Sequence, residues 1–147
     1  MEKNWQLNHL GFVVRDIQQA RNYYERLGIA TLGPERVMET QDGGEVKTCQ
    51  VIIGPLEIEF LQPVDGEGPS SQFLKQRGEG INHLAFNVTD FDKEIKRLVT
   101  RGVKLIFRTE DDWYGKVAYF DTGEIGGVLL ELVQLPTSIK SEPGTTT

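Results

Sequence analysis

The chain contains two histidines in 147 residues, His9 and His83, and they occupy matching positions in a repeated sequence. Residues 8–16 read NHLGFVVRD and residues 82–90 read NHLAFNVTD, so Asn, His, Leu, Phe, Val and Asp recur in register. An imidazole can act as a general base or as a metal ligand. A histidine in a strand is usually a surface residue, so the recurrence carries more weight than either residue alone.

Two glutamates recur in the same way. Glu59 lies in residues 56–62 (LEIEFLQ), and Glu131 lies in residues 128–134 (VLLELVQ). Both are surrounded by apolar residues, where an unpaired carboxylate is costly and metal coordination is one of the few ways to tolerate it. Each half of the chain therefore supplies one histidine and one glutamate, which predicts a single metal site on a pseudo-twofold axis.

Two neutral imidazoles and two carboxylates suit a divalent ion such as Co, Ni, Mn, Fe or Zn. Four protein ligands on an octahedral ion leave two adjacent positions for a substrate with two neighbouring oxygens. An ion in such a site can act as a Lewis acid on a bound substrate oxygen. We expect Glu59 and Glu131 to flank the metal from opposite sides and to be candidate proton-transfer groups, with Glu45, at the start of a strand, as an alternative base.

The elements that must position these residues also repeat. Each half predicts the order β-α-β-β-β, with a helix that begins after Asp16 and ends at Gly28 in the first half. Asp90 and Gly102 have the same places in the second half. The expected strands are 7–14, 31–37, 46–53, 56–62, 81–88, 104–107, 116–121 and 128–134. The expected buried stripes of the two helices are Ile17, Ala20, Tyr24 and Leu27, and Phe91, Ile95, Leu98 and Val99.

The expected fold class is α+β, with two tandem βαβββ modules that form a curved mixed-sheet, barrel-like cleft with helices outside. Strand side chains alternate between faces, which puts the histidines and glutamates on the face away from the helices. We expect a single domain over residues 1–147. Its parts are a first module (7–62), a linker with a short helix (63–80), a second module (81–134) and a frayed tail (135–147).

Net charge, cysteine content and the distribution of apolar residues indicate which partners and which cellular compartment to expect. The net charge is −6 and no basic run is present, which argues against nucleic acid as a partner. Cys49 is the single cysteine, which fits a reducing compartment. Residues 1–5 are not an apolar run and no membrane-spanning run is present, so we expect no leader and a cytoplasmic protein without a membrane partner. Half-domains of this kind can pair within or between chains, so a homodimer, with the site within one chain or shared across the interface, is a further expectation.

These motifs resemble the vicinal oxygen chelate superfamily, which includes glyoxalase I, extradiol dioxygenases and bleomycin resistance proteins. Within it, the likeness is greatest to the methylmalonyl-CoA epimerases. The segments that carry this likeness are 8–14, 58–63, 73–75, 80–86 and 126–132.

The resemblance implies that His9, Glu59, His83 and Glu131 are metal ligands of an epimerase that acts on an acyl-CoA. Lys47, Arg108 and Lys116 are then candidates to meet CoA phosphates. The chain departs from the epimerases in two places. It has Gly80-Ile81-Asn82-His83 where epimerases usually carry Gly-x-His-His, and Asp121-Thr122-Gly123 where they tend to carry His-Pro-Lys.

Three alternatives remain open on the sequence. A glyoxalase I-like lactoylglutathione lyase would use the same four ligands on a glutathione adduct. An Fe(II) dioxygenase needs two histidines and one carboxylate, and Glu59 as a fourth candidate ligand argues against it. A metal-free small-molecule binding protein would not need the His and Glu set, which this chain retains in full.

Overall fold

The computed structural model describes residues 4–40, 44–112 and 114–137. In this part of the chain eight strands form one mixed sheet, in the order β2-β3-β4-β1-β5-β8-β7-β6. The strands are β1 Gln6–Val13, β2 Thr31–Glu39, β3 Glu45–Ile53, β4 Leu56–Pro63, β5 Gly80–Asn87, β6 Lys104–Asp111, β7 Gly115–Asp121 and β8 Leu129–Gln134. The helices are α1 Ile17–Leu27, α2 Pro69–Arg77 and α3 Phe91–Thr100.

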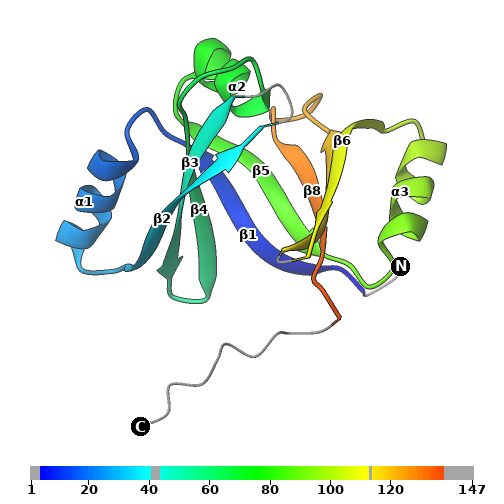
Figure 1. The fold of residues 1–147 in the computed structure, drawn as a ribbon, viewed down its shortest axis with the longest axis horizontal. Coiled ribbons are helices and arrows are strands. Elements are labelled where there is room, and N and C mark those ends of the chain that lie inside the picture. Colours follow the sequence, from blue (N-terminus) through cyan, green and yellow to red (C-terminus); the bar gives the residue numbers. More distant parts are fainter. Residues whose placement is uncertain (1–3, 41–43, 113, 138–147) are drawn as a thin grey trace, which may run out of the picture.

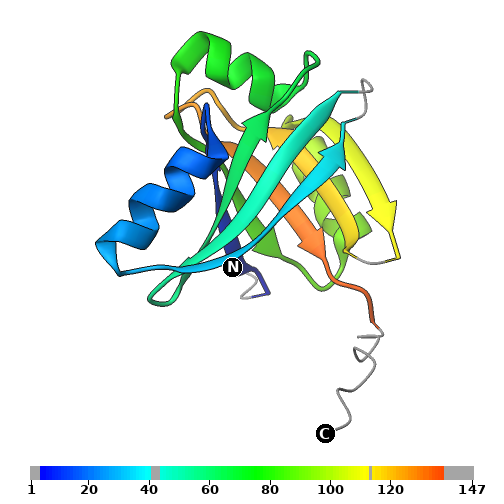
Figure 2. The same cartoon turned by 60° about the vertical axis from the view of Figure 1, so that its left-hand side comes forward.

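The sheet is strongly curved, with α1 and α3 on its outer side at opposite ends (Figures 1 and 2). Helix α2 links the two halves and covers one end of the curved sheet. Each half has the order β-α-β-β-β, and strands β1 and β5 join the halves in antiparallel pairing. The predicted α+β fold is therefore confirmed. Most of the predicted tail, residues 138–147, lies outside the described residues.

The capping contacts confirm the predicted starts of both helices and the predicted end of α1. Helix α3 has Arg101 as its C-cap, one residue before the predicted Gly102, which has φ 89°. The Asp16 side chain accepts hydrogen bonds from the backbone N–H groups of Gln18 and Gln19, and the Asp90 side chain accepts one from Lys93. Gly28 ends α1 in the left-handed region, with φ 68°, a conformation that favours glycine. Within the described residues no helix has the length and apolar character needed to cross a membrane.

Helices α1 and α3 each pack on their own half of the sheet. Helix α1 contacts β3 and β4 through Ile17, Ala20 and Tyr24, and α3 packs on β7 and β8 in the same way. The predicted stripes were wrong at their ends, because Leu27 is 46% exposed and Val99 is 49% exposed. Leu27 is the last residue of α1, and Val99 is one residue past the buried Leu98, about 100° further around the helix.

A repeated glutamine joins the starts of α1 and α3 to the last strands of their halves, β4 and β8. The Gln62 side-chain oxygen accepts a hydrogen bond from the backbone N–H of Ile17 at 2.8 Å. Gln134 does the same for Phe91 at 2.9 Å. Both glutamines end the repeated segments that contain the glutamates, so these segments also hold the helices in place.

We expect Gln62→Leu and Gln134→Leu each to lower the free energy of unfolding by about 1–2 kcal/mol, because each leaves a helix N–H without its partner. Urea denaturation measures this loss. Gln76→Leu, at an exposed position on α2, is the control. A loss no greater than that of the control would contradict the role of these glutamines.

Candidate metal centre

Four adjacent strands each contribute one polar side chain to the interior of the curved sheet. In the order β4-β1-β5-β8 these are Glu59, His9, His83 and Glu131. The two central strands therefore carry the histidines and the two flanking strands carry the glutamates. The predicted convergence of the two halves occurs within one continuous sheet of a single chain.

The strand register places these residues in two rows that cross the sheet. In one row, Gly11 of β1 pairs with both Glu59 of β4 and His83 of β5. The internal repeat relates the second row to the first, and Ala85 of β5 has the position that corresponds to Gly11. The members of the second row are His9, Ala85 and Glu131.

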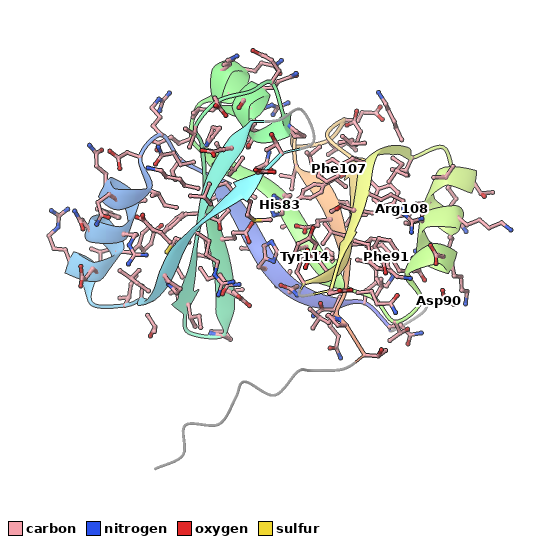
Figure 3. All side chains as sticks on the ribbon, viewed as in Figure 1. His83, Asp90, Phe91, Phe107, Arg108 and Tyr114 are labelled. Carbon is pink, nitrogen blue, oxygen red and sulfur yellow. The ribbon has the colours of Figure 1, made fainter. Side chains whose placement is uncertain are left out.

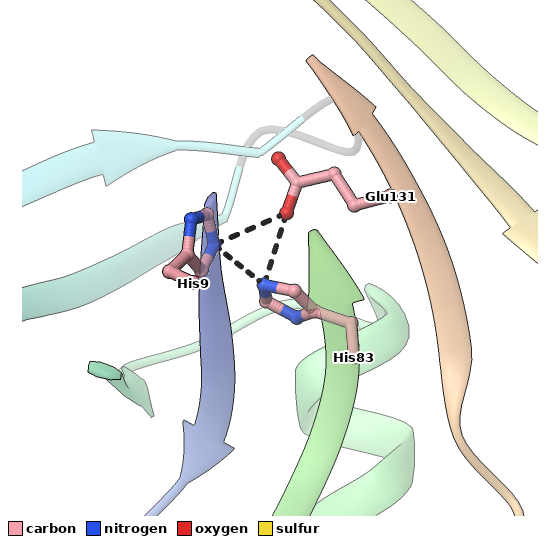
Figure 4. Close-up of side chains that lie close together, drawn as sticks. All are labelled: His9, His83 and Glu131. Atoms are coloured by element: carbon pink, nitrogen blue, oxygen red, sulfur yellow. Dashed lines mark hydrogen bonds and ion pairs between the residues drawn. The ribbon is translucent and has the colours of Figure 1, made fainter. Parts of the chain in front are cut away.

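Three of the four side chains meet closely (Figure 4). Nε2 of His83 lies 3.0 Å from Nε2 of His9 and 3.0 Å from Oε2 of Glu131. Nε2 of His9 lies 3.3 Å from Oε2 of Glu131. All three residues are buried. Glu59 lies beside this triad, with its Oε1 4.0 Å from Nε2 of His9. Among the described residues, His9, His83 and Glu131 form a group that could hold a metal ion, because their ligand atoms all lie within 4.8 Å of one another.

The chemistry of these three donors fits a divalent cation. Nδ1 of each imidazole lies against a side-chain amide oxygen, which can only accept a hydrogen bond. Nδ1 therefore carries the proton, and a neutral ring presents the lone pair of Nε2 to the other ring and to Glu131. Two lone pairs and a carboxylate repel one another unless a cation or a proton lies among them.

The pKa values of His9 and Glu131 show how a proton takes that place. Burial lowers the pKa of His9, but the hydrogen bond to Glu131 and the charges of Glu59, Glu131 and Glu57 outweigh it and raise the pKa to about 9. Burial raises the pKa of Glu131, but the charge and hydrogen bond of His83, together with His9, outweigh it and lower the pKa to about 2. At neutral pH the triad thus holds a buried carboxylate and a protonated His9.

The family model of the Glyoxalase/Bleomycin resistance protein/Dioxygenase superfamily matches residues 8–119. The chain belongs to this superfamily. It is 31% identical over 131 residues to the uncharacterized Bacillus subtilis protein YqjC, and the match covers 87% of this chain and 91% of that protein. It is 28% identical to bovine mitochondrial methylmalonyl-CoA epimerase, over 87% of this chain and 73% of that enzyme.

A solved structure agrees with this membership. The methylmalonyl-CoA epimerase of Mycobacterium tuberculosis has a TM-score of 0.72 and 28% sequence identity to this chain. The match covers 90% of this chain and 88% of that structure. The superfamily includes enzymes, and the triad occupies the interior of the fold that this chain shares with them.

Gly11 is a site residue that the sequence analysis missed. A Cβ atom at this position would overlap the imidazole of His83, so the ring occupies the space that the missing side chain leaves. Ala85, at the matching position of the other half, is buried beside His9 and Glu131. A glycine in the middle of a strand marks a close approach, and that signal was available in the sequence.

Tyr119 of β7 was also missed. It pairs with Glu131, and its hydroxyl lies 3.5 Å from Nε2 of His83. Its ring stacks on Phe107 of β6 with a centroid distance of 4.9 Å. Burial and the charges of Glu131 and Glu59 raise the pKa of Tyr119 well above its usual value, so the hydroxyl stays protonated and can donate a hydrogen bond at the site.

The structure does not bring Glu45 to the triad. Glu45 is exposed at the start of β3, five residues before Gln50, which pairs with Glu59. That separation is about 16 Å along the strand. Glu45 and Cys49 lie on the same face of β3, because they are four residues apart in the strand. Cys49 packs towards α1 and away from the interior.

Two of the three candidate CoA-binding cations face the outside of the sheet. Arg108 lies over the ring of Phe91, with 5.3 Å to its centroid, and donates to Asp92 of α3 at 3.1 Å (Figure 3). Lys116 lies 3.8 Å from the same carboxylate. Both are therefore paired on the side of α3, away from His83.

We expect Gly11→Ala to abolish metal binding, because the added methyl group displaces the His83 ring from the triad. Zn²⁺ titration by calorimetry measures the loss. Gly123→Ala is the matched control, since a Cβ there meets no atom closer than 3.4 Å. Wild-type Zn²⁺ affinity in Gly11→Ala would show that His83 does not contribute a ligand in this position.

We expect metal binding at neutral pH to release about one proton per ion, because His9, with a pKa of about 9, must lose its proton to act as a ligand. Calorimetry in buffers of different ionisation enthalpy measures this number, and metal affinity should rise with pH up to about 9. Metal binding without proton uptake or release would contradict the assignment of this proton to His9.

Without metal, the raised pKa of His9 stabilises the fold fully below pH 6.5, and this contribution to the free energy of unfolding is lost as the pH rises through about 9.

Proposed function

We propose that this chain is a divalent-metal-dependent isomerase that moves the α-proton of an acyl-CoA thioester, with methylmalonyl-CoA as its substrate. The observation that carries the proposal is the Glu-His-His-Glu arrangement across four adjacent strands, with a carboxylate on each flank. The similarity to bovine methylmalonyl-CoA epimerase over 87% of this chain supports the choice of substrate class.

His9, His83 and Glu131 would hold the ion, with Glu59 as the fourth ligand from the neighbouring strand. A bound divalent ion supplies Lewis-acid stabilisation of an enolate oxygen. The chain's own part is to present two nitrogens and a carboxylate oxygen at 3.0–3.3 Å from one another in a buried interior. The Tyr119 hydroxyl beside His83 can donate a hydrogen bond to a substrate oxygen there.

Inversion at carbon needs one group that accepts the proton from one face of the enolate and another that donates on the opposite face. Glu59 and Glu131 stand on the two flanking strands, one on each side of the histidines. We therefore assign proton transfer to Glu59 and Glu131.

The test is exchange of the α-proton of methylmalonyl-CoA in D₂O, followed by NMR after loading the protein with Co²⁺. We expect the wild type to catalyse exchange, and Glu59→Gln and Glu131→Gln to slow it by about 100-fold or more, because an amide can neither accept the proton nor supply a carboxylate ligand to the ion. Glu45→Gln is the matched control and should keep the wild-type rate, since Glu45 lies at the exposed end of β3.

A wild-type protein that binds metal but does not exchange this proton would overturn the choice of substrate. Conversion of the methylglyoxal–glutathione hemithioacetal by the same sample would then identify a glyoxalase I-like lyase. A wild-type protein that takes up no metal would overturn the enzymatic proposal and indicate a binding protein of the same fold.

A further inference from the structure

The residue before His9 interrupts the pairing of β1 with β5. Leu7 pairs with Phe86, but His9 pairs with Ala85, so Asn8 is an extra residue in β1 without a partner position in β5. One extra residue in one strand of an antiparallel pair is a β-bulge. Bulges re-aim side chains and are over-represented beside active sites.

The residue before His83 interrupts the same pairing from the other strand. Gly11 pairs with His83, but Phe12 pairs with Ile81, so Asn82 is the extra residue in β5. The two bulges are therefore related by the same repeat that relates the two histidines. Each histidine directly follows a bulged asparagine.

The bulges bring each asparagine to the ring of its own neighbour. In a regular strand, consecutive side chains point to opposite faces, so an asparagine could not contact the next ring. Here Oδ1 of Asn8 lies 2.8 Å from Nδ1 of His9, and Oδ1 of Asn82 lies 2.9 Å from Nδ1 of His83. Both contacts lie on the side of the ring away from the Nε2 atoms that face Glu131.

We propose that these two Asn-His bulges are positioning units that orient the imidazoles for metal binding. Each asparagine oxygen accepts the Nδ1–H of its histidine, which selects the tautomer with Nε2 free and holds the plane of the ring. Partners of this kind on metal-binding histidines set tautomer and orientation. The inference rests on the proposed metal site.

The two asparagines are held in different ways. The Asn8 amide donates from Nδ2 to Oδ1 of Asn87 at 2.8 Å, which orients its oxygen towards His9. Asn82 is 3% exposed, and its Nδ2 has no hydrogen-bond partner among the described residues. A buried amide nitrogen without a partner opposes folding. The Asn82 side chain is therefore explained by what its oxygen does for His83 rather than by a contribution to stability.

Zn²⁺ titration, with the metal alone as probe, tests the proposal in Asn8→Leu and Asn82→Leu, which keep the size of the side chain and remove the acceptor. We expect each to weaken Zn²⁺ binding by about 10- to 100-fold. Asn8→Asp and Asn82→Asp retain an acceptor oxygen and should restore tight binding. Asn22→Leu, the same exchange at an exposed position of α1, should bind Zn²⁺ like the wild type.

Imidazole ¹H–¹⁵N correlation spectra of the Zn²⁺-loaded protein give a readout that a merely structural role would not change. Because the chain has two histidines, each ring can be assigned separately. In the wild type we expect both rings to carry the proton on Nδ1. Asn8→Leu should alter the signals of His9 alone, and Asn82→Leu those of His83 alone.

Leucine variants that bind Zn²⁺ as tightly as the wild type, with unchanged ring signals, would overturn the positioning role and leave the proposed function intact if the wild type exchanges the substrate proton. Equal weakening by leucine and aspartate would also overturn it, because the acceptor would then be irrelevant. A wild type that binds no Zn²⁺ or Co²⁺ would overturn both this inference and the proposed function.

Discussion

The antiparallel contact between β1 and β5 is the interaction on which the rest of the structure depends. It joins the two βαβββ halves into one sheet and sets the order β4-β1-β5-β8, so that one polar side chain from each strand reaches the same interior. A shift of one residue in this pairing would turn the side chains of one strand to the other face. Gly11 is part of the same constraint, because the His83 ring from the opposite strand needs the space above it.

A second constraint is electrostatic. Glu131 is buried at 5% exposure, and a buried carboxylate must be compensated. A proton on His9 provides that compensation in the metal-free chain, and a divalent ion would replace it. Folding and the proposed ion binding therefore draw on the same three side chains, and the proton on His9 explains how the buried carboxylate is tolerated without an ion.

The sequence predicted the repeated modules, both helix caps and the interior direction of the histidines and glutamates, because each follows from local periodicity and from the duplication. It did not predict the asparagine contacts, since alternation in a regular strand places adjacent residues on opposite faces and the bulges appear only in the pairing of two strands. Tyr119 was missed for a related reason. Its strand is adjacent to β8 in the sheet, and nothing in its own segment shows that its hydroxyl lies beside His83.

By itself the sequence determined which residue types are available at the site and on which face of their strands they lie. Hydrophobic patterning is local, so a single chain is enough to read it. Only the tertiary structure decided that His9, His83 and Glu131 meet within 3.3 Å while Glu59 stays 4.0 Å from His9 and Glu45 lies far from all of them. Those distances depend on sheet curvature and on the register between strands distant in the chain, and no local pattern encodes either quantity.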